Sequence, residues 1–150
     1  MGPRRHCCRR SLRALRFYNG KWQLISGDQK APTNIENHCA QTGVFYSCEQ
    51  IVDGKTAALV VFLPMSKTGG EEYRTHVLTP DAKPSGNLHD LTIEGDKWFY
   101  TWNSTETGTK VFWRDVITFS GPDKIHFEIQ SSADGNTWET QKQGDEQRIK

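Results

Sequence analysis

Polar and apolar residues alternate with a period of two over residues 88–103. Gly95-Asp96 divides this stretch into two runs, and a two-residue loop that begins with Gly suits the type II′ turn of a β-hairpin. Folding the runs together about this loop collects one set of residues on a single face: His89, Leu91, Ile93, Trp98, Tyr100 and Trp102. Only a period of two separates the faces so cleanly, so the pattern predicts an antiparallel hairpin with one buried face.

Residues 110–119 and 124–130 repeat this pattern on either side of the turn-forming cluster Ser120-Gly121-Pro122-Asp123. A loop of two or of four residues gives one face made of Phe112, Arg114, Val116, Thr118, Ile125, Phe127 and Ile129. The opposite face then carries Asp115, Lys124, His126 and Glu128. In this predicted register, Arg114 is the one cation on an otherwise apolar face.

The rest of the chain also consists of short strand-like runs separated by turn signals. Strands are predicted at residues 21–26, 35–41, 44–52, 56–63 and 71–78, and around Trp138. Asp53-Gly54 is typical of a type I′ hairpin turn. Regular short strands favour a sandwich or a barrel, and consecutive hairpins favour the barrel, because a meander that closes on itself has no exposed edge. We therefore predict an all-β fold, an antiparallel up-and-down meander of about 8–10 strands closed into a barrel.

Basic residues are concentrated at the start of the chain. Residues 1–16 contain six arginines and no acidic residue, which leaves 13 basic and 18 acidic residues for the rest. We expect a disordered or non-core tail over 1–16, one barrel domain over 17–145 and a polar tail over 146–150. A basic arm for nucleic acid or anionic lipid, or a transit peptide, is the alternative for the first segment. The mildly acidic remainder indicates no nucleic-acid surface, and no apolar run approaches the roughly 20 residues of a membrane-spanning helix.

Two of the four cysteines, Cys39 and Cys48, flank a short turn about Gly43. A hairpin there would bring the two thiols within disulfide range, and a disulfide would imply a periplasmic or secreted protein. The alternative is a pair of buried free thiols in a cytoplasmic protein. His38 beside Cys39 does not predict a zinc site, because no second pair of ligands with the required spacing accompanies it.

Several short stretches carry a resemblance to a known family. They are Gly20-Lys21-Trp22, Asn37-His38-Cys39, residues 44–48, residues 94–98 and residues 132–138. Together they resemble a group of bacterial calycin-like domains of unknown function, over roughly residues 17–145. The resemblance implies a lipocalin-like β-barrel with an interior cavity, and it supplies no catalytic residues.

The candidate ligand-binding residues are Arg114, His89, Tyr100 and Trp102. A guanidinium on an apolar interior face must be paired, so Arg114 either anchors a ligand carboxylate or phosphate, or forms an internal salt bridge or lies at the barrel rim. The aromatic residues on the predicted interior face describe a small-molecule pocket. They describe a packed barrel core equally well.

Catalytic motifs do not appear in the sequence: there is no nucleophile elbow, phosphate loop or metalloprotease helix motif. We therefore predict a barrel that binds a small apolar or amphipathic molecule, with no metal and no cofactor. The alternatives are a haem-binding or enzymatic barrel of the nitrobindin-like type and a structural domain with a filled core. For haem, the candidate axial ligands are His89 and His76.

Overall fold

The computed structural model of the chain describes residues 14–25, 31–65, 71–81, 88–105 and 107–150. A short 3₁₀ helix, η1 (Ala14–Tyr18), precedes ten strands. The strands are β1 (Gly20–Ile25), β2 (Thr33–Thr42), β3 (Phe45–Val52), β4 (Lys55–Pro64), β5 (Glu71–Leu78), β6 (His89–Glu94), β7 (Lys97–Ser104), β8 (Val111–Phe119), β9 (Lys124–Ser132) and β10 (Glu139–Arg148).

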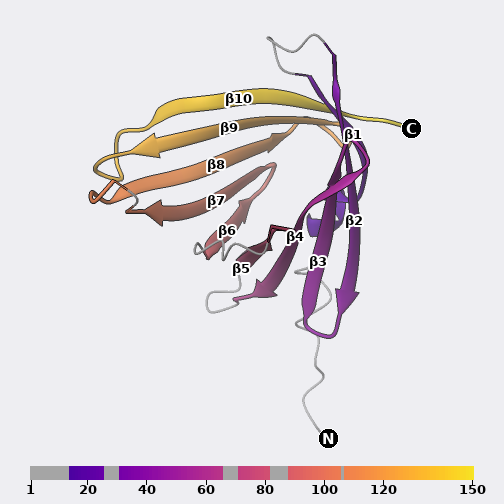
Figure 1. Cartoon of the computed structure of the whole chain (residues 1–150), viewed down its shortest axis with the longest axis horizontal. Helices are drawn as coiled ribbons and strands as arrows, with labels where there is room; N and C mark the ends of the chain where they lie inside the picture. The colour runs from indigo at the N-terminus through magenta and orange to yellow at the C-terminus, as the bar shows by residue number, and fades with distance from the viewer. Residues whose placement is uncertain (1–13, 26–30, 66–70, 82–87, 106) are drawn as a thin grey trace, which may run out of the picture.

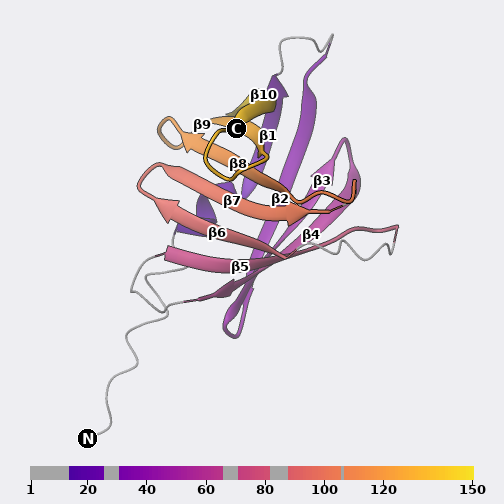
Figure 2. The same ribbon diagram turned by 90° about the vertical axis from the view of Figure 1, so that its left-hand side faces the viewer.

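The strands form one closed barrel in which every neighbouring pair is antiparallel (Figures 1 and 2). Each strand pairs with the strands before and after it in the sequence, and β1 closes the barrel by pairing with β10, where Trp22 lies opposite Arg148. The predicted all-β, up-and-down, antiparallel barrel is therefore confirmed. A meander of this kind hydrogen-bonds both edges of every strand.

Two of the predicted hairpin turns have the expected geometry. Ile93 lies opposite Trp98 and Leu91 lies opposite Tyr100, so the β6–β7 register is the predicted one. Gly95 has a φ of 63°, as the first position of a type II′ turn requires. In the β3–β4 turn, Asp53 and Gly54 have φ values of 46° and 80°, which fits type I′.

The predicted register of the β8–β9 hairpin is wrong by one residue. Phe119 lies opposite Ile125 and Ser120 donates its backbone N–H to the carbonyl of Lys124, so the loop consists of three residues, 121–123. An odd loop shifts the pairing by one residue, and such a shift moves every side chain of the strand to the other face. Asp115 and Ile117 therefore share the interior face with Phe127, while Arg114 faces outward.

One end of the barrel is covered by η1 and by the end of β10. Leu15 and Trp22 are completely buried there, and the indole Nε1 of Trp22 donates a hydrogen bond to the carbonyl of Tyr18 at 3.0 Å. The guanidinium of Arg148 lies over the Trp22 ring, 4.2 Å from its centroid. It also donates hydrogen bonds to the carbonyls of Phe17 and Asn19, both at 2.7 Å.

The folded unit extends past both boundaries expected from the sequence, 17 and 145. Leu15 belongs to the buried core, and β10 continues to Arg148. Residues 146–148 are polar and nevertheless belong to β10, because a strand that closes a barrel needs only every second residue inside. Most of the arginine-rich segment, residues 1–13, lies outside the described residues.

Cys39 and Cys48 lie directly opposite each other on β2 and β3. Their sulfur atoms are 2.11 Å apart, which is the distance of a disulfide. Cys48 is buried, so the pair joins two neighbouring strands on the interior side of the barrel.

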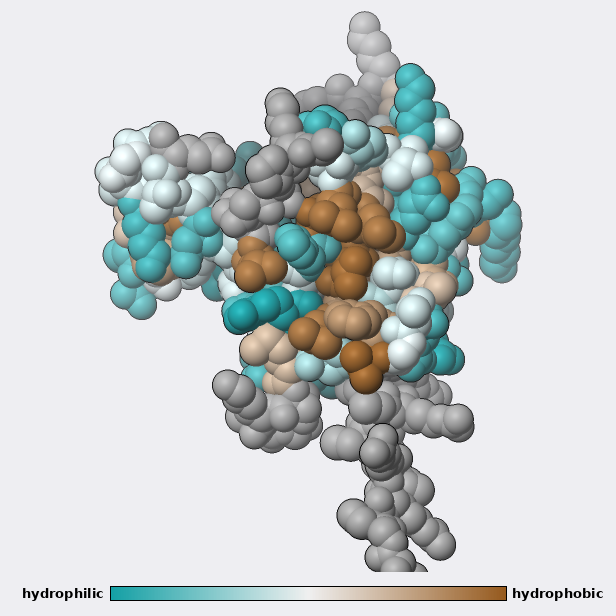
Figure 3. Space-filling model, turned by 60° about the horizontal axis from the view of Figure 1, so that its bottom comes forward, coloured by the Kyte–Doolittle hydropathy of each residue, from teal (hydrophilic) through white to brown (hydrophobic). Residues whose placement is uncertain are grey.

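Apolar side chains also occur on the surface of the molecule. Figure 3 shows a group of them near the centre of one face. The exposed large apolar residues are Phe17, Ile25, Val44, Phe45, Leu63, Leu78, Leu88 and Ile149. Among the described residues, no helix has the length and apolar character needed to span a membrane.

Candidate functional site

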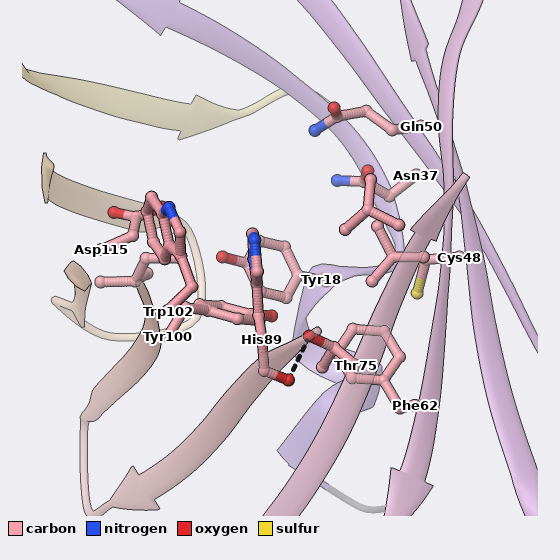
Figure 4. A pocket seen from close by; sticks show the side chains of 13 residues that line it. Tyr18, Asn37, Cys48, Gln50, Phe62, Thr75, His89, Tyr100, Trp102 and Asp115 are labelled. Atoms are coloured by element: carbon pink, nitrogen blue, oxygen red, sulfur yellow. Dashed lines mark hydrogen bonds between the residues drawn. The ribbon is translucent and has the colours of Figure 1, made fainter. Parts of the chain in front are cut away.

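The barrel interior contains a cavity of about 220 Å³ that is partly open to solvent and has Tyr18 of η1 in its wall (Figure 4). The side chains around it are mainly apolar and aromatic, with a few polar tips. They include Tyr18, Phe62, His89, Tyr100, Trp102 and Asp115. The volume lies a little below the roughly 300–1,000 Å³ of pockets for drug-sized ligands, so the space suits a smaller molecule.

Strand alternation places the aromatic wall. His89 begins β6, and Tyr100 and Trp102 lie two residues apart on β7, so all three point to the same face of the sheet. The rings of His89 and Trp102 are stacked, with centroids 4.5 Å apart and an angle of 15° between the planes. The predicted common interior face of these three residues is confirmed, and their role in ligand binding remains a prediction.

His89 is held as a neutral imidazole. Burial lowers its pKa, and the nearby carboxylate of Asp90 opposes this effect only in part. The backbone carbonyl of His89 accepts a hydrogen bond from the hydroxyl of Thr75 at 2.9 Å, and Thr75 is completely buried. This bond fixes the start of β6 against β5. The lowered pKa favours the neutral imidazole, which has one donor and one acceptor nitrogen.

Two tyrosines supply protonated hydroxyls close to the cavity. Tyr18 comes from η1, and its ring packs edge-on against Trp98 with centroids 4.9 Å apart. Burial is the main cause that raises the pKa values of both Tyr18 and Tyr100, and the charge of Asp115 raises them further. Both hydroxyls therefore keep their protons at neutral pH and can donate or accept hydrogen bonds.

Asp115 is a functional candidate on the interior face, whereas the predicted register had put it on the outer face. It projects from β8 into the cavity wall, opposite Tyr100 on β7 and Ile129 on β9. Its Oδ1 atom is enclosed and has no hydrogen-bond partner among the described residues. Burial raises the pKa of Asp115 to about 7, and the charge of Glu146 adds to the increase. No spacing in the sequence points to this residue. Its face depends on the length of the 121–123 loop, which sets the register of β8 against β9.

Glu146 is a second carboxyl group on the interior side. It lies opposite Leu24 on β1 and Ile125 on β9, and burial raises its pKa to about 7. The barrel interior therefore holds two carboxyl groups whose protonation changes near neutral pH. Their mutual repulsion favours a state in which at least one of them is protonated.

Arg114 takes no part in the cavity wall. Its Nε donates a hydrogen bond to Oε1 of Gln130 at 2.6 Å, and its guanidinium lies 4.1 Å from the centroid of the Trp138 ring. Burial lowers its pKa, while the nearby Glu128 raises it. These contacts hold the end of β9 and the following turn on the outer surface, so the interior position predicted for Arg114 is corrected.

The two histidines considered as haem ligands lie on opposite sides of the sheet. His89 lines the cavity, whereas His76 is exposed, because Thr75 beside it points inward. Within the described part of the chain, no cluster of three or more His, Cys, Asp or Glu residues has the arrangement of a metal site.

Comparisons with known proteins support the fold alone. No protein-family model matches the chain, and no curated protein matches it in sequence. Among solved structures, the crystal structure of Rv2717c from M. tuberculosis is similar, with a TM-score of 0.50 and 16% sequence identity. The match covers 94% of this chain and 98% of that one, so the two barrels correspond over almost their whole lengths.

Proposed function

We propose that this chain is a calycin-like, lipocalin-like binding domain that holds one small, partly apolar molecule inside its barrel. The observation that carries the proposal is the cavity of about 220 Å³, walled by aromatic rings and reached by a few polar tips. Binding sites for small molecules have this composition, with apolar walls for affinity and isolated polar groups for orientation. A barrel of eight to ten strands leaves interior space for one such ligand.

The size of the cavity limits the ligand. An apolar cavity of roughly 150 Å³ accepts one benzene molecule. The present cavity of about 220 Å³ therefore suits a single ring with a short side arm. A ligand of this size agrees with the small apolar or amphipathic molecule expected from the sequence.

We also propose an oxidising compartment, periplasmic or extracellular. Its support is the pairing of Cys39 and Cys48 at disulfide distance. Disulfides persist in such compartments and are rare in a reducing cytoplasm.

Ligand binding is tested by filling the cavity. Val60 lines it, and Val61 is the next residue of β4, on the outer face. The intact protein is titrated with 2-phenylethanol and with indole, and binding is followed by calorimetry. We expect Val60→Phe to weaken binding at least tenfold and the matched Val61→Phe to leave it unchanged.

Two results would contradict the proposal. Absence of binding by the unmodified protein would contradict a ligand site of this size in the barrel. Equal effects of the two substitutions would place the binding site outside the barrel. Native mass spectrometry of the protein as purified adds an independent readout, because a retained cellular ligand appears as a second mass.

A further inference from the structure

The charges around the cavity are all of one sign. Of the thirteen residues that line it, Asp115 is an acid and none is a lysine or an arginine. Glu146, on the interior face of β10, adds a second carboxyl group that acts on Asp115 through its charge. The interior therefore favours positive over negative groups, and low-dielectric walls strengthen that preference.

Asp115 also has an unused acceptor. Its Oδ1 atom is enclosed by protein and has no hydrogen-bond partner in the part of the chain that the structure describes. A buried acceptor without a partner destabilises the fold, and a donor brought by a ligand would remove this cost. An ammonium group satisfies an ionised carboxylate better than a neutral donor does, because a charge-assisted hydrogen bond is stronger.

The aromatic wall lies beside this carboxylate. Figure 4 shows Asp115, Trp102 and Tyr100 on one side of the cavity, with Asn37 and Gln50 on the opposite side. His89 is stacked on Trp102 at 4.5 Å, so the wall near Asp115 is built of flat rings. Aromatic faces attract organic cations and also pack against the apolar body of a ligand.

We propose that the cavity selects a small primary amine with a single ring, whose ammonium group binds Asp115 and whose ring lies against Trp102, His89 and Tyr100. This inference rests on the proposed ligand-binding function and specifies the chemical class of the ligand. The amides of Asn37 and Gln50, across the cavity, are available to a polar substituent at the other end of the molecule. Carboxylic acids of the same size are excluded, because the negative charges of Asp115 in the cavity wall and of Glu146 on β10 would repel their carboxylate.

Binding is coupled to pH through the groups that face Asp115. These are Tyr18 from η1, His89 from β6, Tyr100 from β7 and Glu146 from β10. The pKa of Asp115 is about 7, so an ammonium group must displace a proton from it at lower pH. Affinity for the amine therefore rises with pH up to about 7 and is constant above it, as long as the amine stays protonated.

The test uses three probes of equal length: 2-phenylethylamine, 2-phenylethanol and phenylacetate. Calorimetric titration of the intact protein at pH 8 is expected to give at least tenfold tighter binding of the amine than of the alcohol, with phenylacetate weakest. Asp115→Asn keeps the shape of the side chain and should bring the amine to within threefold of the alcohol. Asp96→Asn removes the same charge from an exposed turn and should change nothing.

The ranking of the three probes by the unmodified protein decides the proposal even if the Asp115 variant does not fold. Equal or tighter binding of the alcohol would overturn the amine assignment and leave the proposed binding function intact. A preference for the amine that persists in a folded Asp115→Asn protein would overturn the role of Asp115. Failure of all three probes and of indole to bind the unmodified protein would overturn the binding function itself.

Discussion

Asp115 links the protonation of the barrel interior to the stability of the fold. Its pKa is about 7 in the folded chain and 3.8 in its ordinary state, and the main cause is burial. A carboxyl group with a raised pKa binds a proton more tightly in the folded state than in the unfolded state. Its contribution to stability is therefore fully present below pH 3.8 and is lost as the pH rises towards 7.

We expect Asp115 by itself to lower the free energy of unfolding by roughly 2–4 kcal/mol between pH 4 and pH 8, since one pKa unit corresponds to about 1.4 kcal/mol. Asp115→Asn should remove a large part of this fall and make the protein more stable than the unmodified chain at pH 8. Urea denaturation at several pH values measures both curves. Parallel curves for the two proteins would contradict the assignment.

Asp134 produces the opposite pH dependence in the β9–β10 turn. Its carboxylate accepts hydrogen bonds from the backbone N–H groups of Asn136 and Thr137, both at 2.8 Å, and from the Ser132 hydroxyl. These bonds lower its pKa to about 2. Their stabilisation is present above pH 4 and is lost as the pH falls towards 2.

Replacing Asp134 with Ala should lower the melting temperature at pH 7 and lower it clearly less at pH 2, where about half of the native carboxyl groups are protonated. Thermal denaturation followed by circular dichroism measures the difference. Asp96→Ala, in the β6–β7 turn, is a comparison for the loss of an exposed carboxylate. An equal loss at both pH values would show that the role of Asp134 does not depend on its charge.

Among the elements, the hairpins show how far the sequence predicts this fold. The β6–β7 hairpin was predicted to the residue because Gly95-Asp96 permits one loop length, and so His89, Tyr100 and Trp102 were placed on the interior face. The cluster Ser120–Asp123 permits loops of two, three or four residues, and hydrophobicity did not distinguish them. Ile117 and Phe119 make one face of β8 apolar, and Phe112 and Val116 make the other face apolar as well. The hydrophobic pattern of β8 therefore did not identify Asp115 as an interior residue.

The cap formed by η1 and Arg148 is a second element whose contribution to the free energy of unfolding can be measured. Arg148 stacks on Trp22 and donates to three carbonyls, those of Phe17, Asn19 and Pro122. We expect Arg148→Ala to destabilise the protein by about 2 kcal/mol or more, because the fixed guanidinium plane serves stacking and hydrogen bonding together. Arg148→Lys should recover little of this, because an ammonium lacks the planar fork of donors.

Arg74→Ala is the matched control for the cap. Arg74 forms an exposed ion pair with Asp90 on the outer face, with an N–O distance of 3.0 Å. Exposed pairs contribute about 1 kcal/mol or less. Chemical denaturation that ranks the two alanine variants as equal would contradict the role assigned to the cap.

For the molecule as a whole, the disulfide between Cys39 and Cys48 restricts the unfolded chain more than it adds contacts. It closes a loop of nine residues in sequence separation, and a loop of this size corresponds to about 2–3 kcal/mol in the chain-entropy account. We expect the double variant Cys39→Ala, Cys48→Ala to lose about that amount in urea denaturation. A reducing agent should bring the unmodified protein to the same stability and leave the double variant unchanged. A loss of stability in both proteins would show that the reductant acts on something other than the Cys39–Cys48 disulfide.

The pairing of β1 with β10 has a consequence for how the protein is made. A ribosome releases the N-terminal strand first, yet the second edge of β1 finds its partner only when residues 139–148 have been synthesised. Until then the nascent chain is an open, curved sheet whose two outer strands expose unpaired backbone groups, and such edges pair readily with other chains. The barrel can therefore close only after β10 has been synthesised, and the interval before closure is the period in which the chain is most exposed to aggregation and most dependent on chaperones.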